Sequence, residues 1–262
     1  MLVCYPSCKK NKNLLISSIE SFQKHNPKIA FAIFNNNEFS KSDLRDIRKH
    51  CQKLLVFDIS LWMDIFKDCQ AMYFQHNAYI RFLMPRVLWK FDKKIPQIIY
   101  CDEDCYCVGS IEKFWRFPFE NDILGVVDPS DLRICRKNLL RVPRIKNERF
   151  VGINRRNYIN SGLLKMKTRF DIREALKAIN MNIILYCAGI DMLHDQTIVN
   201  KLPHDTIFLK VPKSSNLKHI ISRLSKIMLE NFGLCHTYFF KNDIERINRE
   251  LSKQHLQRIN TT

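Results

Sequence analysis

The sequence predicts an α/β domain with a mostly parallel central sheet flanked by helices. Short apolar, β-branched segments alternate with amphipathic helical segments, which is typical of right-handed βαβ units. The 262 residues suffice for one substantial domain, and a hydrophobic fraction of 46% is enough to build its core. Two aspartates directly follow one of the apolar segments, where parallel sheets place their binding sites. We therefore expect a Rossmann-like architecture.

The N-terminal part of the chain shows the alternation clearly. Apolar residues recur at helical spacing between Lys12 and Lys24, and Ser40 is expected to cap a second helix because Asp43 stands three residues later. The expected order is strand 1–5, helix 12–24, strand 28–34, helix 40–51 and strand 54–59.

A further helix is expected over residues 77–89, with a kink at Pro85. Arg81 lies within its apolar context, just before an expected strand over residues 97–101. Its side chain pairs with Asp102, reaches a phosphate, or extends its head to solvent. The sequence leaves these three alternatives open.

The rest of the chain continues the pattern around a basic connection. Residues 133–156 form either a solvated loop or a docking site for an anionic acceptor or lipid headgroup. The expected elements are strand 122–127, strand 158–166, helix 170–180, helix 191–201, basic amphipathic helix 217–229, strand 233–240 and helix 242–257. Helix 217–229 suits an interfacial membrane contact, although core packing explains its pattern equally well. We divide the chain into a domain over residues 1–210 and a basic helical tail over residues 211–262.

Basic residues dominate the charge balance, with 43 Lys and Arg against 26 Asp and Glu and a formal net charge of +17. Such a charge favours nucleic acid, anionic lipid or a phosphorylated substrate as partner. No helix-turn-helix, zinc module or stacking surface is recognisable, which argues against nucleic acid. We find no signal peptide and no apolar run that could span a bilayer, so we expect a cytoplasmic protein, peripheral on the inner membrane.

The ten cysteines contain no paired C-x-x-C knuckle and are interpreted as scattered core thiols. Cys101, Cys105 and Cys107 flank the acidic group, but they lack the second cluster that a zinc site needs.

The acidic group Asp102-Glu103-Asp104 follows the strand 97–101. In an extended backbone, Asp102 and Asp104 share a face and Glu103 points the other way. Two carboxylates at the carboxyl edge of a sheet suit Mg²⁺ or Mn²⁺, with positions left for phosphate oxygens. The alternative is a solvated acidic turn, because the D-x-D pattern alone is common.

Two later segments offer groups for sugar recognition. Asn160-Ser161-Gly162 interrupts the strand 158–166, and a glycine there marks either a simple bulge or a close approach of backbone to ligand. The helix 191–201 holds Asp195 and Gln196, an acceptor and an amide that suit sugar hydroxyls.

Five segments, in this order, resemble the family 8 retaining glycosyltransferases, in particular the bacterial galactosyl- and glucosyltransferases that extend lipopolysaccharide: AYIRFLMPRVL, YCDEDCYCVGSIEKFW, YINSGLLKM, HDQTIVN and CHTYFFK. The resemblance implies a GT-A fold, a nucleotide-sugar donor such as UDP-galactose or UDP-glucose, and a manganese or magnesium ion. It also implies a lipid-linked or lipopolysaccharide acceptor.

Position by position, the resemblance assigns the metal to Asp102, Asp104 and His236, and the reacting face of the sugar to Asp195 and Gln196. The resulting donor-binding set is Tyr5, Ser7, Asn11, Arg81, Asp102, Glu103, Asp104, Asn160, Ser161, Asp195, Gln196 and Lys241. The loop after the first strand departs from the family, which reads uracil and ribose there with acidic and Asn residues. Glu103 replaces the usual small residue of the D-x-D, and Lys241 lacks the usual H-Y-x-G spacing.

The expected function is therefore metal-dependent transfer of a hexose with retention of configuration. An ion helped by Lys241 neutralises the leaving diphosphate. The paired carboxylates of glycoside hydrolases are not evident, so we favour same-face attack with Gln196 stabilising the sugar cation. The alternatives are a catalytically inactive sugar-nucleotide-binding relative and a basic nucleic-acid-binding protein.

Overall fold

The computed structural model describes residues 1–66, 76–127, 159–187, 194–207 and 234–236, with the backbone alone for residues 76–77, 127, 181–187, 194–195 and 234–236. The basic connection 133–156, the helices 217–229 and 242–257, and Lys241 lie outside these residues. In the described part, no helix is long and apolar enough to cross a membrane.

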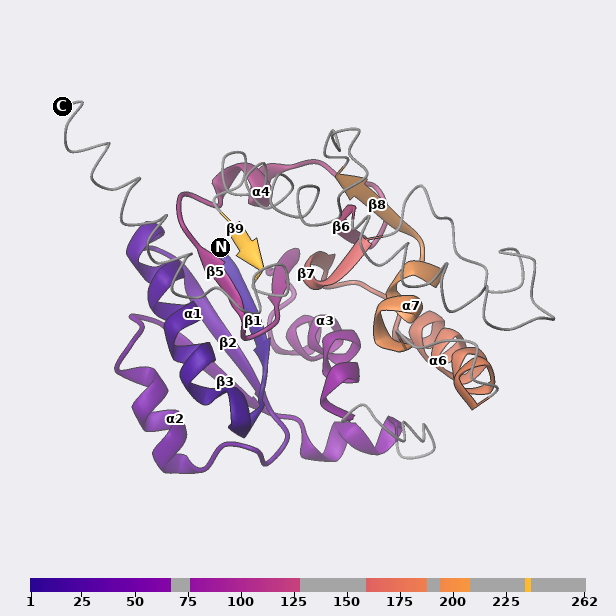
Figure 1. Cartoon of the computed structure of the whole chain (residues 1–262), viewed down its shortest axis with the longest axis horizontal. Coiled ribbons are helices and arrows are strands. Elements are labelled where there is room, and N and C mark those ends of the chain that lie inside the picture. Colours follow the sequence, from indigo (N-terminus) through magenta and orange to yellow (C-terminus); the bar gives the residue numbers. More distant parts are fainter. Residues whose placement is uncertain (67–75, 128–158, 188–193, 208–233, 237–262) are drawn as a thin grey trace, which may run out of the picture.

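Seven strands form the central sheet, in the order β3-β2-β1-β4-β7-β6-β8 (Figure 1). Strand β7 is antiparallel to both neighbours, and the other paired neighbours run parallel. The strands are β1 (Leu2–Pro6), β2 (Ala30–Asn35), β3 (Leu54–Asp58), β4 (Gln97–Cys101), β6 (Ile123–Val127), β7 (Ile159–Lys167) and β8 (His204–Ile207). The prediction of a mostly parallel sheet is confirmed.

A two-stranded ribbon stands beside this sheet. Strand β5 (Cys105–Cys107) pairs antiparallel with β9 (Leu234–His236), which comes from the far end of the chain (Figure 1). The sequence predicted β9 within a longer strand, but it predicted neither β5 nor β8, because segments of three or four residues are too short to show a period.

Helices cover both faces of the sheet, so the chain forms three layers (Figure 1). They are α1 (Lys12–His25), α2 (Lys41–Arg48), α3 (Ile80–Phe91), α4 (Glu112–Arg116), α6 (Ile172–Cys187) and α7 (His194–Lys201), with short 3-10 turns at Lys9–Asn11, Ser60–Phe66 and His76–Tyr79. Pro85 lies inside α3, which continues through it.

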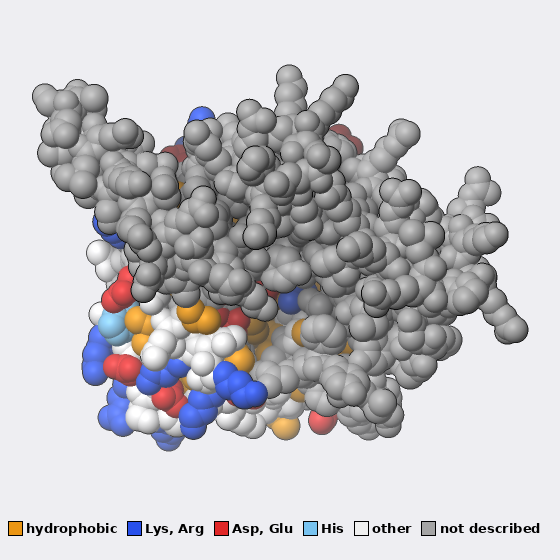
Figure 2. Space-filling view, in the orientation of Figure 1, with side chains coloured by type: hydrophobic (Ala, Val, Ile, Leu, Met, Phe, Trp, Pro, Cys, Tyr) orange, Lys and Arg blue, Asp and Glu red, His pale blue; other side chains and the backbone are white. Residues whose placement is uncertain are grey.

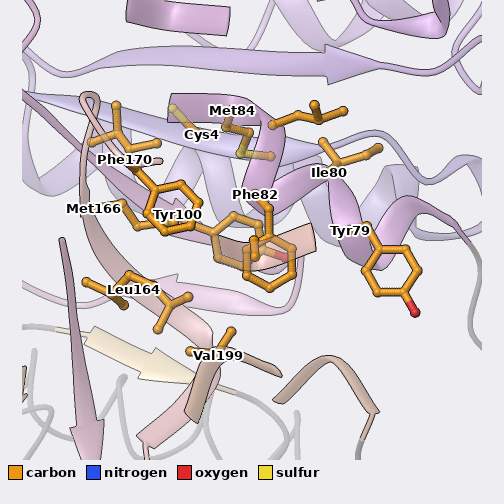
Figure 3. Packing of buried hydrophobic residues seen from close by; sticks show 14 of the residues in the cluster. Cys4, Tyr79, Ile80, Phe82, Met84, Tyr100, Leu164, Met166, Phe170 and Val199 are labelled. Atoms are coloured by element: carbon orange, nitrogen blue, oxygen red, sulfur yellow. The ribbon is translucent and has the colours of Figure 1, made fainter. Parts of the chain in front are cut away.

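The core divides into two apolar clusters because successive side chains of a strand face opposite sides of the sheet. One cluster joins the sheet to α3, α6 and α7 and includes Tyr100, Phe82 and Leu164 (Figure 3). The other joins it to α1, α2 and α4 and includes Val3, Phe22 and Phe114. All three layers therefore meet at the central strands β1, β4 and β7.

Helix α2 begins as its sequence predicts. The Ser40 side chain accepts from the Asp43 amide, and the Asp43 carboxylate accepts from the Ser40 amide, which completes a capping box. Lys12 of α1 pairs with Asp43 and Asp46, each at 3.0 Å. Basic and acidic side chains lie side by side on the described part of the face that Figure 2 shows.

Strand β7 bulges at the Asn160-Ser161-Gly162 segment. Gly125 of β6 pairs with Leu164, and Val127 pairs with Ile159. The two paired positions are therefore two residues apart in β6 but five residues apart in β7. The bulge also changes which face the side chains occupy, since Ile159 packs in the cluster with α3 and Leu163 in the cluster with α1. The prediction of a bulge in this strand is confirmed.

Candidate active site

The candidate site lies at the carboxyl edge of β1 and β4, beside the bulge of β7. Asp102 directly follows β4, and Ser7 directly follows β1, the parallel neighbour of β4. On the other side of β4, Cys101 pairs with Leu163, which places the bulge next to the acidic group. This edge is where open α/β sheets bind their ligands.

The acidic group forms a tight turn. The Cys105 amide donates to the Asp102 carbonyl at 3.1 Å, which closes a turn over residues 102–105. The expected alternation of an extended backbone is therefore wrong, because the chain reverses here to enter β5.

Glu103 is buried within this turn, with 8% of its surface exposed. Burial, together with the negative charges of Asp102 and Asp104, raises the pKa of its carboxyl to about 8. Glu103 also acts on the first loop, since its charge contributes after burial to the raised pKa of Cys8. The sequence predicted that the Glu103 side chain points away from Asp102 and Asp104, but their charges still act on its carboxyl.

Two side chains hold one oxygen of Asp102. The Tyr100 hydroxyl donates to Asp102 Oδ1, and Arg81 Nη2 lies 3.6 Å from the same oxygen. The Arg81 guanidinium also stacks over the Tyr100 ring, 4.6 Å from its centroid. Burial raises the pKa of Tyr100 well above its usual value, so the phenol keeps the proton that it donates.

Arg81 is buried, with 4% of its surface exposed, and it is anchored on the backbone as well. Its Nη1 donates to the Ser161 carbonyl at 2.7 Å, and its Nε donates to the Ala78 carbonyl at 2.9 Å. Of the three alternatives, pairing with Asp102 is confirmed and extension to solvent is wrong. Contact with a phosphate stays a prediction.

The β7 bulge provides the carbonyls that organise the turn. The Asp102 amide donates to the Gly162 carbonyl at 2.8 Å, and Cys105 Sγ donates to the same oxygen at 3.3 Å. Asn160 Oδ1 accepts from the Gly162 amide at 2.8 Å and so stabilises the bulge itself. Ser161 and Gly162 therefore bind Arg81 and Asp102 directly.

Helix α7 is attached to the same bulge. Ser161 Oγ lies 3.4 Å from Gln196 Oε1, and both side chains are buried. Asn200, one turn after Gln196, donates to the carbonyls of Gln196 and Ile159 and accepts from the Ile159 amide at 2.7 Å. The sequence interpretation missed Asn200, although its i+4 spacing from Gln196 on one helix face was a usable signal.

The backbone of His236 lies next to the acidic turn. His236 pairs with Cys105, the residue after Asp104, across the β5–β9 ribbon. Among the described side chains, no group of three or more His, Cys, Asp or Glu residues is arranged as a metal site, and the His236 side chain is not among them. The side chain of Asp195 likewise lies outside the described residues.

The predicted contacts of the first loop differ in their access to the site. The Tyr5 side chain is fully buried against α1, where its hydroxyl hydrogen-bonds with Ser18 at 2.8 Å, so this side chain is not available to a sugar donor. Ser7 is buried and its hydroxyl accepts from the Asn36 amide at 3.0 Å. Asn11 is half-buried at the N-cap position of α1, where its side chain makes no capping hydrogen bond.

The three cysteines around the turn are buried core thiols without disulfide bonds. Burial raises the pKa of Cys107 to about 12 and that of Cys105 well above its usual value.

Comparison with known proteins decides the family. The model of glycosyl transferase family 8 matches residues 13–210, which is most of the chain. The chain belongs to glycosyl transferase family 8. It is therefore a glycosyltransferase, and the resemblance of the five sequence segments is confirmed. No curated protein matches this sequence.

Solved structures confirm the fold of this family 8 glycosyltransferase. The galactosyltransferase LgtC, in complex with donor and acceptor sugar analogs, superposes with a TM-score of 0.64 at 14% identity, over 90% of this chain and 86% of LgtC. The bifunctional glycosyltransferase WbbM gives 0.62 at 12% identity, over 90% of this chain and 45% of WbbM. Mouse xyloside xylosyltransferase 1 gives 0.51 at 14% identity, over 90% and 96% of the two chains. The predicted GT-A fold is confirmed.

We expect Arg81→Met to lower the free energy of unfolding of this glycosyltransferase by about 2–4 kcal/mol, because the carbonyls of Ala78 and Ser161 lose their hydrogen-bond donor and the Asp102 carboxylate loses its ion-pair partner. The free energy of unfolding of Arg81→Lys is expected to lie between those of Arg81→Met and the parent, since one ammonium cannot reproduce the fork of the guanidinium. Urea denaturation measures both. The control is Arg86→Met on the exposed side of α3, expected within about 0.5 kcal/mol of the parent. Equal stability of the Arg81→Met and Arg86→Met variants would contradict this account.

Proposed function

We propose that this family 8 enzyme transfers galactose or glucose from a UDP-sugar to a lipopolysaccharide core or another surface-glycan acceptor, with retention of configuration and with Mn²⁺ or Mg²⁺. The observation that carries the proposal is the β7 bulge, which joins the acidic turn, Arg81 and Gln196 at one sheet edge. The family match and the likeness to LgtC, a galactosyltransferase, support it.

The residues at the acidic turn fit a hard divalent cation. Asp102 and Asp104 offer carboxylate oxygens, and the backbone of His236 lies beside them. Asp102, Asp104 and His236 would hold the ion. When bound, it supplies positive charge against the diphosphate that leaves the sugar.

The chain's own cations complete the donor site in this proposal. Arg81 is held rigidly beside Asp102 and is proposed to steady the donor side of the pocket. Lys241 is proposed to meet the diphosphate, where an ammonium acts as a compact charge. Fixed charges that await the developing anion need no reorganisation during the reaction, which is the basis of electrostatic catalysis.

Gln196 is proposed to stabilise the sugar as it gains positive charge. Its amide is a poor nucleophile, so the acceptor hydroxyl attacks from the face that the diphosphate leaves, and the leaving phosphate takes the acceptor proton. Ser161 orients the amide oxygen, and Asn200 fixes the backbone of Gln196. Asp195 is proposed to bind a hydroxyl of the same sugar.

The formal charge of +17 suits an acceptor that is presented at an anionic membrane. The basic segment 133–156 and the amphipathic segment 217–229 are proposed to contact that surface.

We expect the purified chain with Mn²⁺ to release UDP from one UDP-hexose in a panel of nucleotide sugars, tested with truncated lipopolysaccharide as acceptor. Chelation should abolish turnover, and Asp104→Asn should lower it at least about 100-fold because a proposed metal ligand is lost. Asp171→Asn, which removes a carboxylate paired with Arg173 outside the site, is the control and should keep full activity. Silence across the panel would favour an inactive nucleotide-sugar-binding relative, and turnover that survives chelation would contradict the metal.

We expect proton NMR of the product to show the anomeric configuration of the donor. Gln196→Ala should lower kcat by about 100-fold with a smaller change in KM, since its contact strengthens as the sugar becomes cationic. The matched control is Gln23→Ala on α1, whose amide donates to the Pro27 carbonyl. A covalent glycosyl adduct on Asp195 or Gln196, detected by mass spectrometry, would exclude same-face attack.

The full chain should float with liposomes that contain anionic lipid and stay behind with zwitterionic liposomes. High salt should release it, because the attraction is screened. Failure to float with anionic liposomes at low salt would rule out the membrane contact.

A further inference from the structure

Tyr100 contributes to the site although its ring belongs to the core. The ring is buried in the cluster between the sheet and α3, close to Phe82 (Figure 3). Its hydroxyl leaves that apolar environment and donates to Asp102 Oδ1, two residues further along the chain. Arg81 covers the ring and approaches the same oxygen at 3.6 Å. Three side chains thus form one contiguous unit.

We propose that Tyr100 is a positioning residue, which orients the Asp102 carboxylate as a ligand of the divalent cation. This inference rests on the metal site of the proposed function and adds a residue that touches neither the cation nor the donor. A hydrogen bond from a neighbouring group to a metal-binding side chain fixes the direction of that side chain and commonly changes metal affinity by 10- to 100-fold.

The geometry favours positioning over simple packing. A buried phenol needs a hydrogen-bond partner, and a backbone carbonyl of the core would satisfy that need as well as a carboxylate does. Here the partner is a half-buried carboxylate, with 28% of its side chain exposed, that opens towards the site. Without the hydroxyl, Arg81 at 3.6 Å would still attract Asp102 but would no longer fix the direction in which the carboxylate faces.

The same restraint bears on which cation is accepted. A carboxylate that Tyr100 holds by a hydrogen bond at Oδ1, and that Arg81 attracts at the same oxygen, cannot turn freely to offer both oxygens to a cation. Mn²⁺ and Mg²⁺ accept regular sites with single carboxylate oxygens, whereas Ca²⁺ takes more ligands and often binds a carboxylate through both oxygens. Tyr100 is thereby placed to favour the smaller cations.

The test is Tyr100→Phe, which keeps the ring and removes only the hydroxyl. Free Mn²⁺ is followed by electron paramagnetic resonance while Mn²⁺ is titrated into the full chain with UDP, and Ca²⁺ is then added in competition. We expect Mn²⁺ to bind 10- to 100-fold more weakly and the preference for Mn²⁺ over Ca²⁺ to fall. The matched control is Tyr79→Phe, a fully buried tyrosine of the same cluster whose ring lies 5.4 Å from that of Phe66.

The outcomes separate this inference from the proposed function. If Asp104→Asn weakens Mn²⁺ binding while Tyr100→Phe matches the parent and Tyr79→Phe, the metal site stands and the role of Tyr100 is overturned. If Asp104→Asn also matches the parent, the metal site itself fails. If Tyr100→Phe and Tyr79→Phe weaken Mn²⁺ equally, the effect is general core packing and the role of Tyr100 is again overturned. Thermal unfolding without metal verifies that both variants are folded.

Discussion

Strand β7 contains a bulge, because it has more residues than its neighbour β6 between two positions at which the strands pair. The candidate site is organised around these extra residues. In a regular ladder, each backbone carbonyl pairs with the adjacent strand. In the bulge, the carbonyls of Ser161 and Gly162 instead accept from Arg81, Cys105 and the amide that begins the acidic turn. The side chain of Ser161 then contacts Gln196 on the other side. Without the bulge, α3, the turn after β4 and α7 would have no common point of attachment.

The electrostatics of the site follow from this attachment. Three carboxylates occupy one short turn, and burial and mutual repulsion together raise the pKa of Glu103. Burying a guanidinium costs desolvation free energy. For Arg81, two hydrogen bonds to backbone carbonyls, the ion pair with Asp102 and the contact with the Tyr100 ring offset much of that cost. Arg81 balances part of the negative charge of the turn, and the remaining negative charge suits the cation that we propose to bind there.

The sequence predicted the layers of this fold well because long elements carry a clear period. Helix α1 and strand β4 match their predicted bounds closely, and the capping box at Ser40 follows a local rule. The bulge was also visible, through a glycine inside a strand. The turn at Asp102 was predicted as extended backbone because three residues contain no period, and the reversal depends on β5 pairing with a distant strand. The burial of the Tyr5 side chain depends on which face α1 covers, which the sequence of β1 alone does not encode.

Strand β9 has a consequence for how the site comes into being. Its partner β5 lies in the first half of the chain, immediately after the acidic turn, whereas β9 lies near the other end. Because a protein is synthesised from its N-terminus, the carboxylates, Tyr100 and Arg81 exist in the nascent chain well before His236 is made. Assembly of the ribbon is a long-range closure with a high entropic cost, so it follows the formation of the local βαβ units. The acidic turn and its contacts with Arg81 and Tyr100 can thus be arranged early, whereas the β5–β9 ribbon closes beside them only after synthesis has passed β9.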